Sequence, residues 1–229
     1  DLSSVTTIPE LNAKTIDLGD NSITSTAGFV MAGSTSCNFT TSSQNVNVTV
    51  RRFVSRVALQ KVNNALPASY GAMTINNVTL INVVGNQNLA GAATASTWYN
   101  KMGRKDGATA SNQIIDGSTY LASHPTLTFK SVESSVASGA SHTPTTPYLF
   151  YTFPNSTSND VTGWATSFTA RKTRLVVAAT IGGKKYYYPV VIDTPSRNNA
   201  YTVELTITGL GSTEPDKPVE KGTINASVT

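Results

Sequence analysis

The C-terminal residues 201–229 constrain the fold more than any other part of this chain. Residues 201–208 alternate strictly between apolar and polar side chains, and the apolar set is Tyr201, Val203, Leu205 and Ile207. Strict alternation predicts a β-strand with one buried face. After a polar linker that contains two prolines, residues 223–229 repeat the pattern, with Ile224, Ala226 and Val228 on one face. Such a second strand either folds back onto its own domain or completes the sheet of another molecule by strand addition.

The composition is that of an all-β protein. Charged residues make up only 13% of the 229-residue chain, against about 25% in typical soluble domains. Thr, Ser and Asn take their place, together with Val and Ile. The formal net charge is +4, but the basic residues come in scattered pairs rather than in one stripe. We therefore expect solvated strand ends and loops at these pairs, and no nucleic-acid partner.

Further strand patterns run along most of the chain. They cover residues 46–50, 53–62, 74–84, 126–132, 148–153, 173–181 and 184–192. Gly182 and Gly183 form the predicted hairpin turn between the last two strands. Several short strands separated by turn signals, without a convincing helix, predict a β-sandwich.

A domain boundary is predicted at the Arg51–Arg52 pair. Residues 1–51 are too few to build a closed β domain alone, so they are predicted to be part of an N-terminal β-sandwich domain. Residues 52–210 then form a complete C-terminal β-sandwich domain. Residues 211–229 form a linker and a donor-type strand.

No pattern in the chain predicts catalysis or a cofactor. The sequence lacks a nucleophile elbow, a Walker loop, a dinucleotide fingerprint and a zinc-protease helix. His124 and His142 lie near prolines in loop-like sequence, and the acidic residues are dispersed, so neither a catalytic triad nor a metal site is expected. The single cysteine, Cys37, excludes an internal disulfide. We expect a protein that is not an enzyme.

Two long loops are the expected places for a ligand site. Residues 86–119 and 133–147 exceed the connections of a minimal sandwich. Trp98, Tyr99 and Trp164 lie in or beside loops. Such rings serve either as a sugar-stacking platform or, more simply, as core plugs or subunit contacts, and both interpretations stay open.

Several stretches in a shared order resemble the fimbrillins of the Bacteroidales, the major fimbrial subunits known as type V pilins. These stretches are the basic junction and strand at 50–62, residues 75–86, the strand pair at 174–191 and the closing segment at 201–215. The resemblance covers residues 29–229. It implies transthyretin-like β-sandwich domains, export as a lipoprotein precursor and display on the outer membrane of a Gram-negative bacterium.

The resemblance also implies a mode of assembly. Proteolysis at a basic residue removes an N-terminal strand and opens a groove, which the C-terminal strand of a neighbouring subunit fills. Such an interface is heterologous and open-ended. In this chain the assembly strand would present Ile224, Ala226 and Val228, and the partners would be copies of this chain or related pilins. Membrane contact would be limited to the lipid anchor of the precursor.

The chain departs from the family pattern at both ends. Only residues 1–51 precede the junction, where family members carry a complete domain, so we expect an N-terminally truncated fragment with its processing site upstream of Asp1. The chain also stops at Thr229, before the apolar residues with which family shaft subunits tend to continue. The alternative function is therefore a fimbrial tip or accessory adhesin that binds a host glycan or protein through its long loops.

Overall fold

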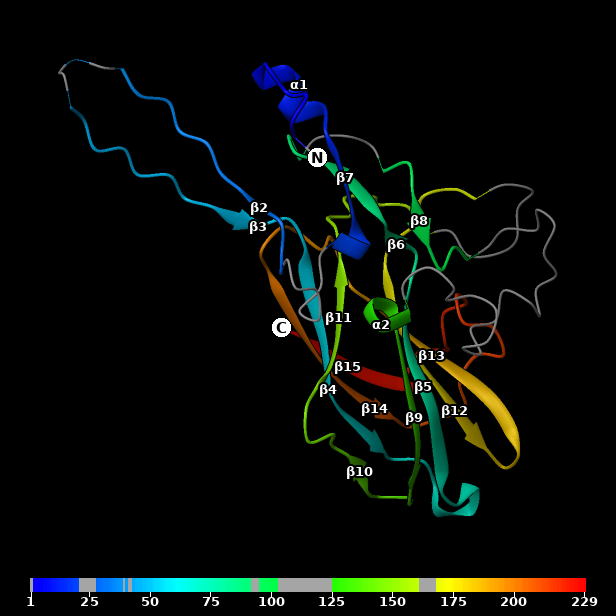
Figure 1. Cartoon of the computed structure of the whole chain (residues 1–229). Coiled ribbons are helices and arrows are strands. Elements are labelled where there is room, and N and C mark those ends of the chain that lie inside the picture. Colours follow the sequence, from blue (N-terminus) through cyan, green and yellow to red (C-terminus); the bar gives the residue numbers. More distant parts are fainter. Residues whose placement is uncertain are drawn as a thin grey trace.

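The body of the molecule consists of two β-sheets packed face to face (Figure 1). The computed structural model describes residues 2–20, 28–38, 40, 43–91, 95–102, 125–160 and 168–229. The first sheet has the strand order β10-β4-β14-β15, with β11 also paired to β4. The second sheet has the order β13-β12-β5-β9.

The first sheet is built around β4. Its strands are β4 (Ser55–Asn64), β10 (Ser141–His142), β11 (Tyr148–Thr152), β14 (Ala200–Ile207) and β15 (Ile224–Val228). Both β10 and β11 run antiparallel to β4, whereas β14 runs parallel to it. The last strand, β15, pairs antiparallel with β14 and forms the edge of the sheet.

The second sheet is antiparallel throughout. Its strands are β5 (Met73–Ile81), β9 (Phe129–Val136), β12 (Arg174–Ile181) and β13 (Lys184–Val191). The hairpin of β12 and β13 turns at Gly182 and Gly183, whose φ angles are 56° and 78°. Side chains disfavour such angles, so two glycines suit this tight turn. The predicted hairpin is confirmed.

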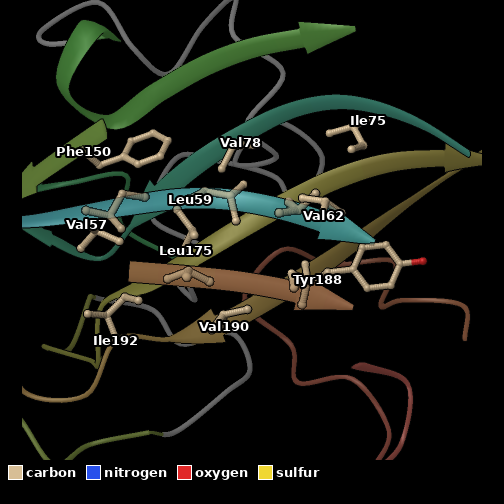
Figure 2. Close-up of a cluster of buried hydrophobic side chains, with 14 of the residues drawn as sticks. Val57, Leu59, Val62, Ile75, Val78, Phe150, Leu175, Tyr188, Val190 and Ile192 are labelled. Carbon is tan, nitrogen blue, oxygen red and sulfur yellow. The ribbon is translucent and has the colours of Figure 1, made fainter. Parts of the chain in front are cut away.

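The main core lies between the two sheets, and both contribute side chains to it (Figure 2). The labelled residues are Val57, Leu59, Val62, Ile75, Val78, Phe150, Leu175, Tyr188, Val190 and Ile192. Along β14 the buried side chains alternate with outward ones, as the period of a strand requires. The all-β class and the sandwich-like arrangement of the sheets are therefore confirmed.

The second sheet is also covered on part of its outer face. Val176, Ala178 and Tyr187 form a smaller buried cluster there with Ile81 and Met102. The neighbouring Tyr188 belongs to the main core instead. Successive side chains of a strand point to opposite faces, so these two tyrosines serve the two faces of one sheet.

Short helices and strands surround the sandwich. The helices are α1 (Ile8–Ala13), η1 (Leu18–Asp20), η2 (Ala68–Tyr70) and α2 (Pro125–Thr128). The short strands are β1 (Thr15–Asp17), β2 (Met31–Ala32), β3 (Arg51–Arg52), β6 (Val83–Val84), β7 (Asn86–Asn88) and β8 (Trp98–Tyr99). Within the described ranges, no helix is long and apolar enough to cross a membrane.

The N-terminal segment is attached to the sandwich through β1. This strand pairs antiparallel with β7, and the following Leu18 is completely buried in the main core. The hydroxyl of Tyr99 lies 2.9 Å from both carboxylate oxygens of Asp17 and donates to them. The division of the chain into domains at residue 51 stays a prediction, as does the transthyretin-like topology.

One strand prediction is wrong, and the predicted strand at 126–132 is wrong for its first part, because α2 extends to Thr128 and β9 begins at Phe129. Residues 46–50 alternate as β14 does, yet they form no strand, and Val46, Val48 and Val50 are exposed. In Figure 1 residues 43–50 run out from the body of the molecule. Alternation favours a strand only where a neighbouring strand and an apolar surface cover one face, and the described residues give this segment neither.

Candidate functional site

A continuous ladder with β14 determines the position of β15. Three pairs of apolar residues lie directly opposite one another: Val228 and Val203, Ala226 and Leu205, and Ile224 and Ile207. Directly opposed residues of an antiparallel ladder share one face of the sheet. The three predicted assembly residues therefore lie together on the core side of the first sheet. In this structure the strand takes the first of its two options and folds back onto its own domain.

The core side of β15 is largely uncovered. The three partner residues in β14 are completely buried, whereas Val228 is 37% exposed and Ala226 is exposed as well. Only Ile224 packs, in part, against the main core. A strand at the edge of a sandwich is covered only as far as the facing sheet extends. An edge strand with an uncovered apolar side is a template for another β-partner.

Backbone hydrogen bonds hold both ends of β15. Thr202 and Thr229 exchange two bonds of 2.8 and 3.1 Å at its C-terminal end. At its start, the amide of Thr208 donates to the carbonyl oxygen of Thr223 at 2.9 Å. Each such bond contributes about 1 kcal/mol net. The strand is thus retained mainly by backbone pairing and by Ile224.

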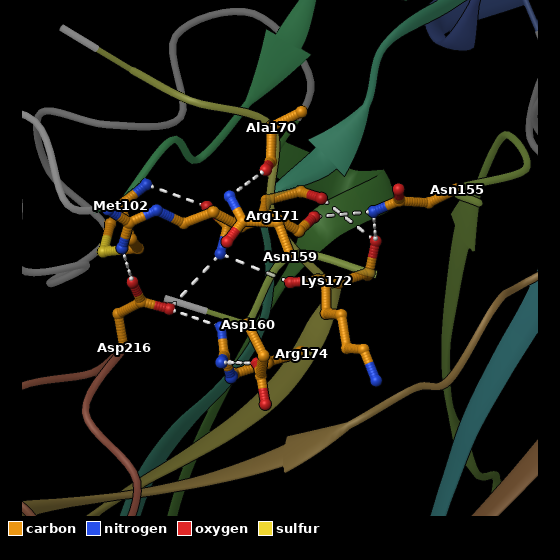
Figure 3. Close-up of polar contacts among 11 residues, drawn as sticks. Met102, Asn155, Asn159, Asp160, Ala170, Arg171, Lys172, Arg174 and Asp216 are labelled. Carbon is orange, nitrogen blue, oxygen red and sulfur yellow. Dashed lines mark hydrogen bonds and ion pairs between the residues drawn. The ribbon is translucent and has the colours of Figure 1, made fainter. Parts of the chain in front are cut away.

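A buried carboxylate anchors the connection between β14 and β15. Asp216 accepts hydrogen bonds from Arg171 Nη1 at 2.6 Å and from Arg174 Nη1 at 2.7 Å (Figure 3). The amide of Asn82 also donates to it, at 3.3 Å. Arg174 pairs in addition with Asp160. Two guanidinium groups thus face two carboxylates, so the charges of this network balance.

Both arginines of the network are almost completely buried, with exposed fractions of 2% for Arg171 and 1% for Arg174. The expectation that the basic pairs are solvated is therefore wrong for Arg171. Buried charges need partners, and here Asp216 supplies one to each arginine. Sequence reasoning missed Asp216 because it lies in a polar linker. The available signal was Arg174, a charged residue inside an otherwise apolar strand.

Burial also changes the acidity of groups along this connection. It raises the pKa of the Asp216 carboxyl above its ordinary value, against the opposing effect of Arg174 and Arg171. It also raises the pKa of Tyr188 to about 12. The Tyr188 hydroxyl donates to the carbonyl oxygen of Gly209 at 3.1 Å. Side chains therefore fix the connection at residues 209 and 216, whereas residues 217–222 are mostly exposed.

A cavity of about 300 Å³ lies beside this exposed part of the connection. Arg174, Pro189 and Val191 of the second sheet line it, together with Val219 and Ile224. The side chains between the edge strands β13 and β15 therefore leave space unfilled there.

The first predicted ligand loop, residues 86–119, is described only in part. Residues 86–91 and 95–102 belong to the described structure, and the remainder of the loop lies outside it. Trp98 and Tyr99 form β8, which pairs with β6, and both are half-buried. Trp164 also lies outside the described residues.

The second predicted ligand loop, residues 133–147, is partly built into the sandwich. It contains the end of β9 and all of β10, which pairs with β4. His142 stacks on Tyr148 with ring centroids 5.9 Å apart, and its Nε2 lies 2.9 Å from the Tyr148 hydroxyl. The other histidine, His124, lies outside the described residues. Among the residues that are described, no three His, Cys, Asp or Glu side chains gather as metal ligands.

Comparison with known proteins identifies the class of fold. No protein-family model and no curated protein matches the chain. A candidate cell adhesion protein from Bacteroides eggerthii is similar in structure, with a TM-score of 0.60 and 22% identity over 100% of this chain and 74% of that one. A second, from Parabacteroides distasonis, has a TM-score of 0.61 and 17% identity over 100% of this chain and 70% of the other.

A fimbrilin from Porphyromonas gingivalis is also similar, with a TM-score of 0.54 and 15% identity over 97% of this chain and 73% of the fimbrilin. The chain therefore has the fold of the Bacteroidales fimbrillin-like proteins, as its sequence motifs predicted.

Proposed function

We propose that this chain is a structural subunit of a bacterial surface fimbria and polymerises head to tail by β-strand donation. The similar structures include a fimbrilin and candidate cell adhesion proteins. This likeness supports a role in a cell-surface appendage, structural rather than catalytic. The observation that carries the mechanism is the uncovered core side of β15, where Ala226 and Val228 are exposed.

The free energy of burial favours donation over the folded-back position. On its own sheet, β15 leaves Val228 37% exposed. In a groove between the two sheets of a neighbour, both Val228 and Ala226 would be covered. Full burial of a valine side chain is worth about 1.5–3 kcal/mol relative to full exposure, and Val228 would gain the part of this that corresponds to its exposed fraction. The backbone hydrogen bonds to β14 would be exchanged for equivalent bonds to the neighbour, so the gain comes from the apolar side chains.

The connection allows β15 to leave while the sandwich stays intact. Asp216 remains anchored between Arg171 and Arg174, and the chain from 217 to 223 can extend once Val219 leaves the core and Gly222 and Thr223 release their hydrogen bonds. Those residues reach about 23 Å when extended, at about 3.3 Å per residue. The ladder to β14, the contacts of Ile224 and Val219, and the hydrogen bonds of Thr208 and Gly209 to residues 222 and 223 need to break.

The acceptor groove and the cellular setting complete the proposal. Proteolysis at a basic residue of an exported lipoprotein precursor removes an N-terminal strand and opens the groove at the outer membrane. The donors that fill it are the C-terminal strands of copies of this chain or of related pilins.

Polymer formation by the processed precursor tests this function. The precursor is cleaved with an Arg- or Lys-specific protease and imaged by negative-stain electron microscopy. Val228→Asp is expected to abolish filaments without unfolding the monomer, because a charge cannot enter an apolar groove. Asn225→Asp is the matched control, since Asn225 is exposed and lies on the opposite face of the same strand. Filaments in the Val228 variant, or their loss in both variants, would contradict strand donation.

The second candidate function is a tip or accessory adhesin that binds a host glycan or protein. A cavity of about 300 Å³ whose described lining includes Val84, Asn86 and Trp98 favours it. Processed protein that stays monomeric and binds such a ligand would move the assignment to this function.

A further inference from the structure

A cavity of about 320 Å³ lies on the first sheet where β4 begins. Arg56 of β4 stands directly opposite Tyr151 of β11 on one side and Ala200 of β14 on the other, and these three residues line the cavity. The next pair along, Val57 and Phe150, points into the core between the sheets (Figure 2). Successive side chains of a strand point to opposite faces, so the cavity opens on the outer face of the first sheet.

Phe29 and Arg52 form one wall of this cavity. The Phe29 ring packs on that of Tyr151, with centroids 5.0 Å apart, and the Arg52 guanidinium lies 5.7 Å from the centroid of Phe29. Arg52 Nη1 also donates to Asn198 Oδ1 at 3.4 Å. The cavity is therefore lined by two aromatic rings and by two arginines, Arg52 and Arg56, whose side chains are both exposed.

Two further arginines lie next to this wall. Arg197 donates from Nε to the carbonyl oxygen of Arg52 at 3.5 Å and from Nη2 to that of Arg51 at 3.3 Å. Its guanidinium also lies over the ring of Phe53, 3.8 Å from the centroid. Within the described ranges, no carboxylate forms an ion pair with any of these four arginines, and no lining residue of the cavity is acidic. The positive charge around the cavity is therefore not neutralised by the described protein.

The acidity of neighbouring groups reflects this positive charge. Burial raises the pKa of the Tyr151 phenol, whereas the charges of Arg56 and Arg52 act to lower it. Burial lowers the pKa of Arg197, and the charge of Arg51 lowers it further. A nearby like charge disfavours a charged group, and an opposite charge favours it. An anion in the cavity would be attracted by Arg52 and Arg56 and would offset the repulsion among the four arginines.

We propose that this cavity binds a small molecule through a phosphate or sulfate ester. Such a group presents three terminal oxygens, which the guanidinium groups of Arg52 and Arg56 can approach together, each through two N–H donors. The volume is at the lower end of the range for small-molecule sites, so the body of the ligand would lie beside Phe29 and the exposed Asn198 and Asn199. Strand donation is not required for this binding, because no lining residue belongs to β15 or to its connection.

Titration with four ligands that differ mainly in their charged group tests the site. The full chain is titrated by ligand-observed NMR with glucose 6-phosphate, glucose 6-sulfate, glucuronate and glucose. At least one of the two esters is expected to bind more tightly than glucuronate, whose carboxylate has only two oxygens, and glucose is expected not to bind. Because the arginines are exposed, added NaCl is expected to weaken the binding of the ester. The comparison of the two esters shows which anion the cavity prefers.

Substitution of single charges separates this site from non-specific attraction. Arg52→Gln and Arg56→Gln are each expected to weaken ester binding at least roughly tenfold. Lys185→Gln is the matched control, because it removes the same charge from an exposed position in β13 of the second sheet, and it is expected to leave binding unchanged.

All three residues are exposed or half-buried at most, so thermal unfolding of the variants is expected to match that of the wild type. Absence of binding by both esters, binding of glucose or glucuronate as tight as that of the esters, or an equal loss in the Lys185 variant would overturn the proposal. So would ester binding that survives both arginine substitutions. Filament formation by the arginine variants is read separately, so failure of this site does not count against strand donation.

Discussion

The neighbouring strands β14 and β15 have the same alternating pattern and very different surroundings. Val203, Leu205 and Ile207 of β14 are completely buried. Their direct partners in β15 share the same face of the sheet, yet Ala226 and Val228 remain exposed. The difference comes from position, because β14 lies between two strands and β15 lies at the edge.

The two strands show that sharing a face and being buried are separate properties of an alternating segment. Alternation predicts which side chains share a face, and it does so correctly for both strands. Whether that face is covered depends on what lies opposite it. Residues 46–50 are the third case. They alternate equally well, but in the described structure they form no strand and their side chains are exposed. A strand such as β15, which is paired by backbone hydrogen bonds but has exposed apolar side chains, is suited to exchange between molecules.

The largest expected effect lies in the connection between the two strands. Asp216→Ala leaves Arg171 and Arg174 buried without their shared carboxylate, and this is expected to lower the free energy of unfolding by about 3–5 kcal/mol. Urea titration measures the change. Asp193→Ala is the matched control, because the pair of Asp193 with Lys172 spans 3.0 Å but leaves the aspartate side chain 69% exposed, and such pairs contribute about 0–1 kcal/mol.

Equal, small losses from these two aspartate substitutions would show that the Asp216 network does not anchor the connection. A large loss for Asp216 alone would locate the anchor of β15 in its linker rather than in the strand.

A direct comparison of the two strands is expected to give the next largest difference. Leu205→Ala opens a cavity in the core and is expected to cost about 2–5 kcal/mol of monomer stability. Val228→Ala removes methyl groups that are already exposed in part, so its effect is expected to stay within about 0.5 kcal/mol. Thermal or urea unfolding of both variants checks this. A cost at Val228 that approaches that at Leu205 would mean that the edge strand is covered in the monomer.

The sequence predicted the sandwich because its main strands carry their own evidence. Residues 173–192 combine two apolar runs with a Gly182–Gly183 turn, and 201–208 alternate without exception. These are local signals, and the structure has a strand at each place. The strand at 223–229 was predicted on the same basis, with Ile224 opposite a core residue of β14 as its one partly buried contact.

The remaining features depend on contacts between residues far apart in the chain. Asp216 meets Arg171 and Arg174 only after the linker has folded across the second sheet. Gln87 and Asn155 line one cavity although β7 and the segment after β11 are separate in sequence. Neither local pattern nor composition encodes such pairings, so the buried network and this cavity emerged from the structure alone.

The smallest expected effect is a pH dependence at the start of the connection. The pKa of Tyr188 is raised by burial to about 12 in the folded protein, from 10.0 for the free side chain. Between these values the unfolded chain loses the phenol proton first, which stabilises the unfolded state. The free energy of unfolding is therefore expected to fall as the pH rises from about 10 to about 12, by on the order of 1–2 kcal/mol.

Tyr188→Phe isolates this contribution from those of the other tyrosines. The variant lacks the hydroxyl that donates to Gly209, so at neutral pH it is expected to be less stable by about 1 kcal/mol. Above pH 10 its stability is expected to decline less steeply than that of the wild type, because no phenol remains at this buried position. Parallel curves for the two proteins would show that Tyr188 is solvated and that the connection is held at Asp216 alone.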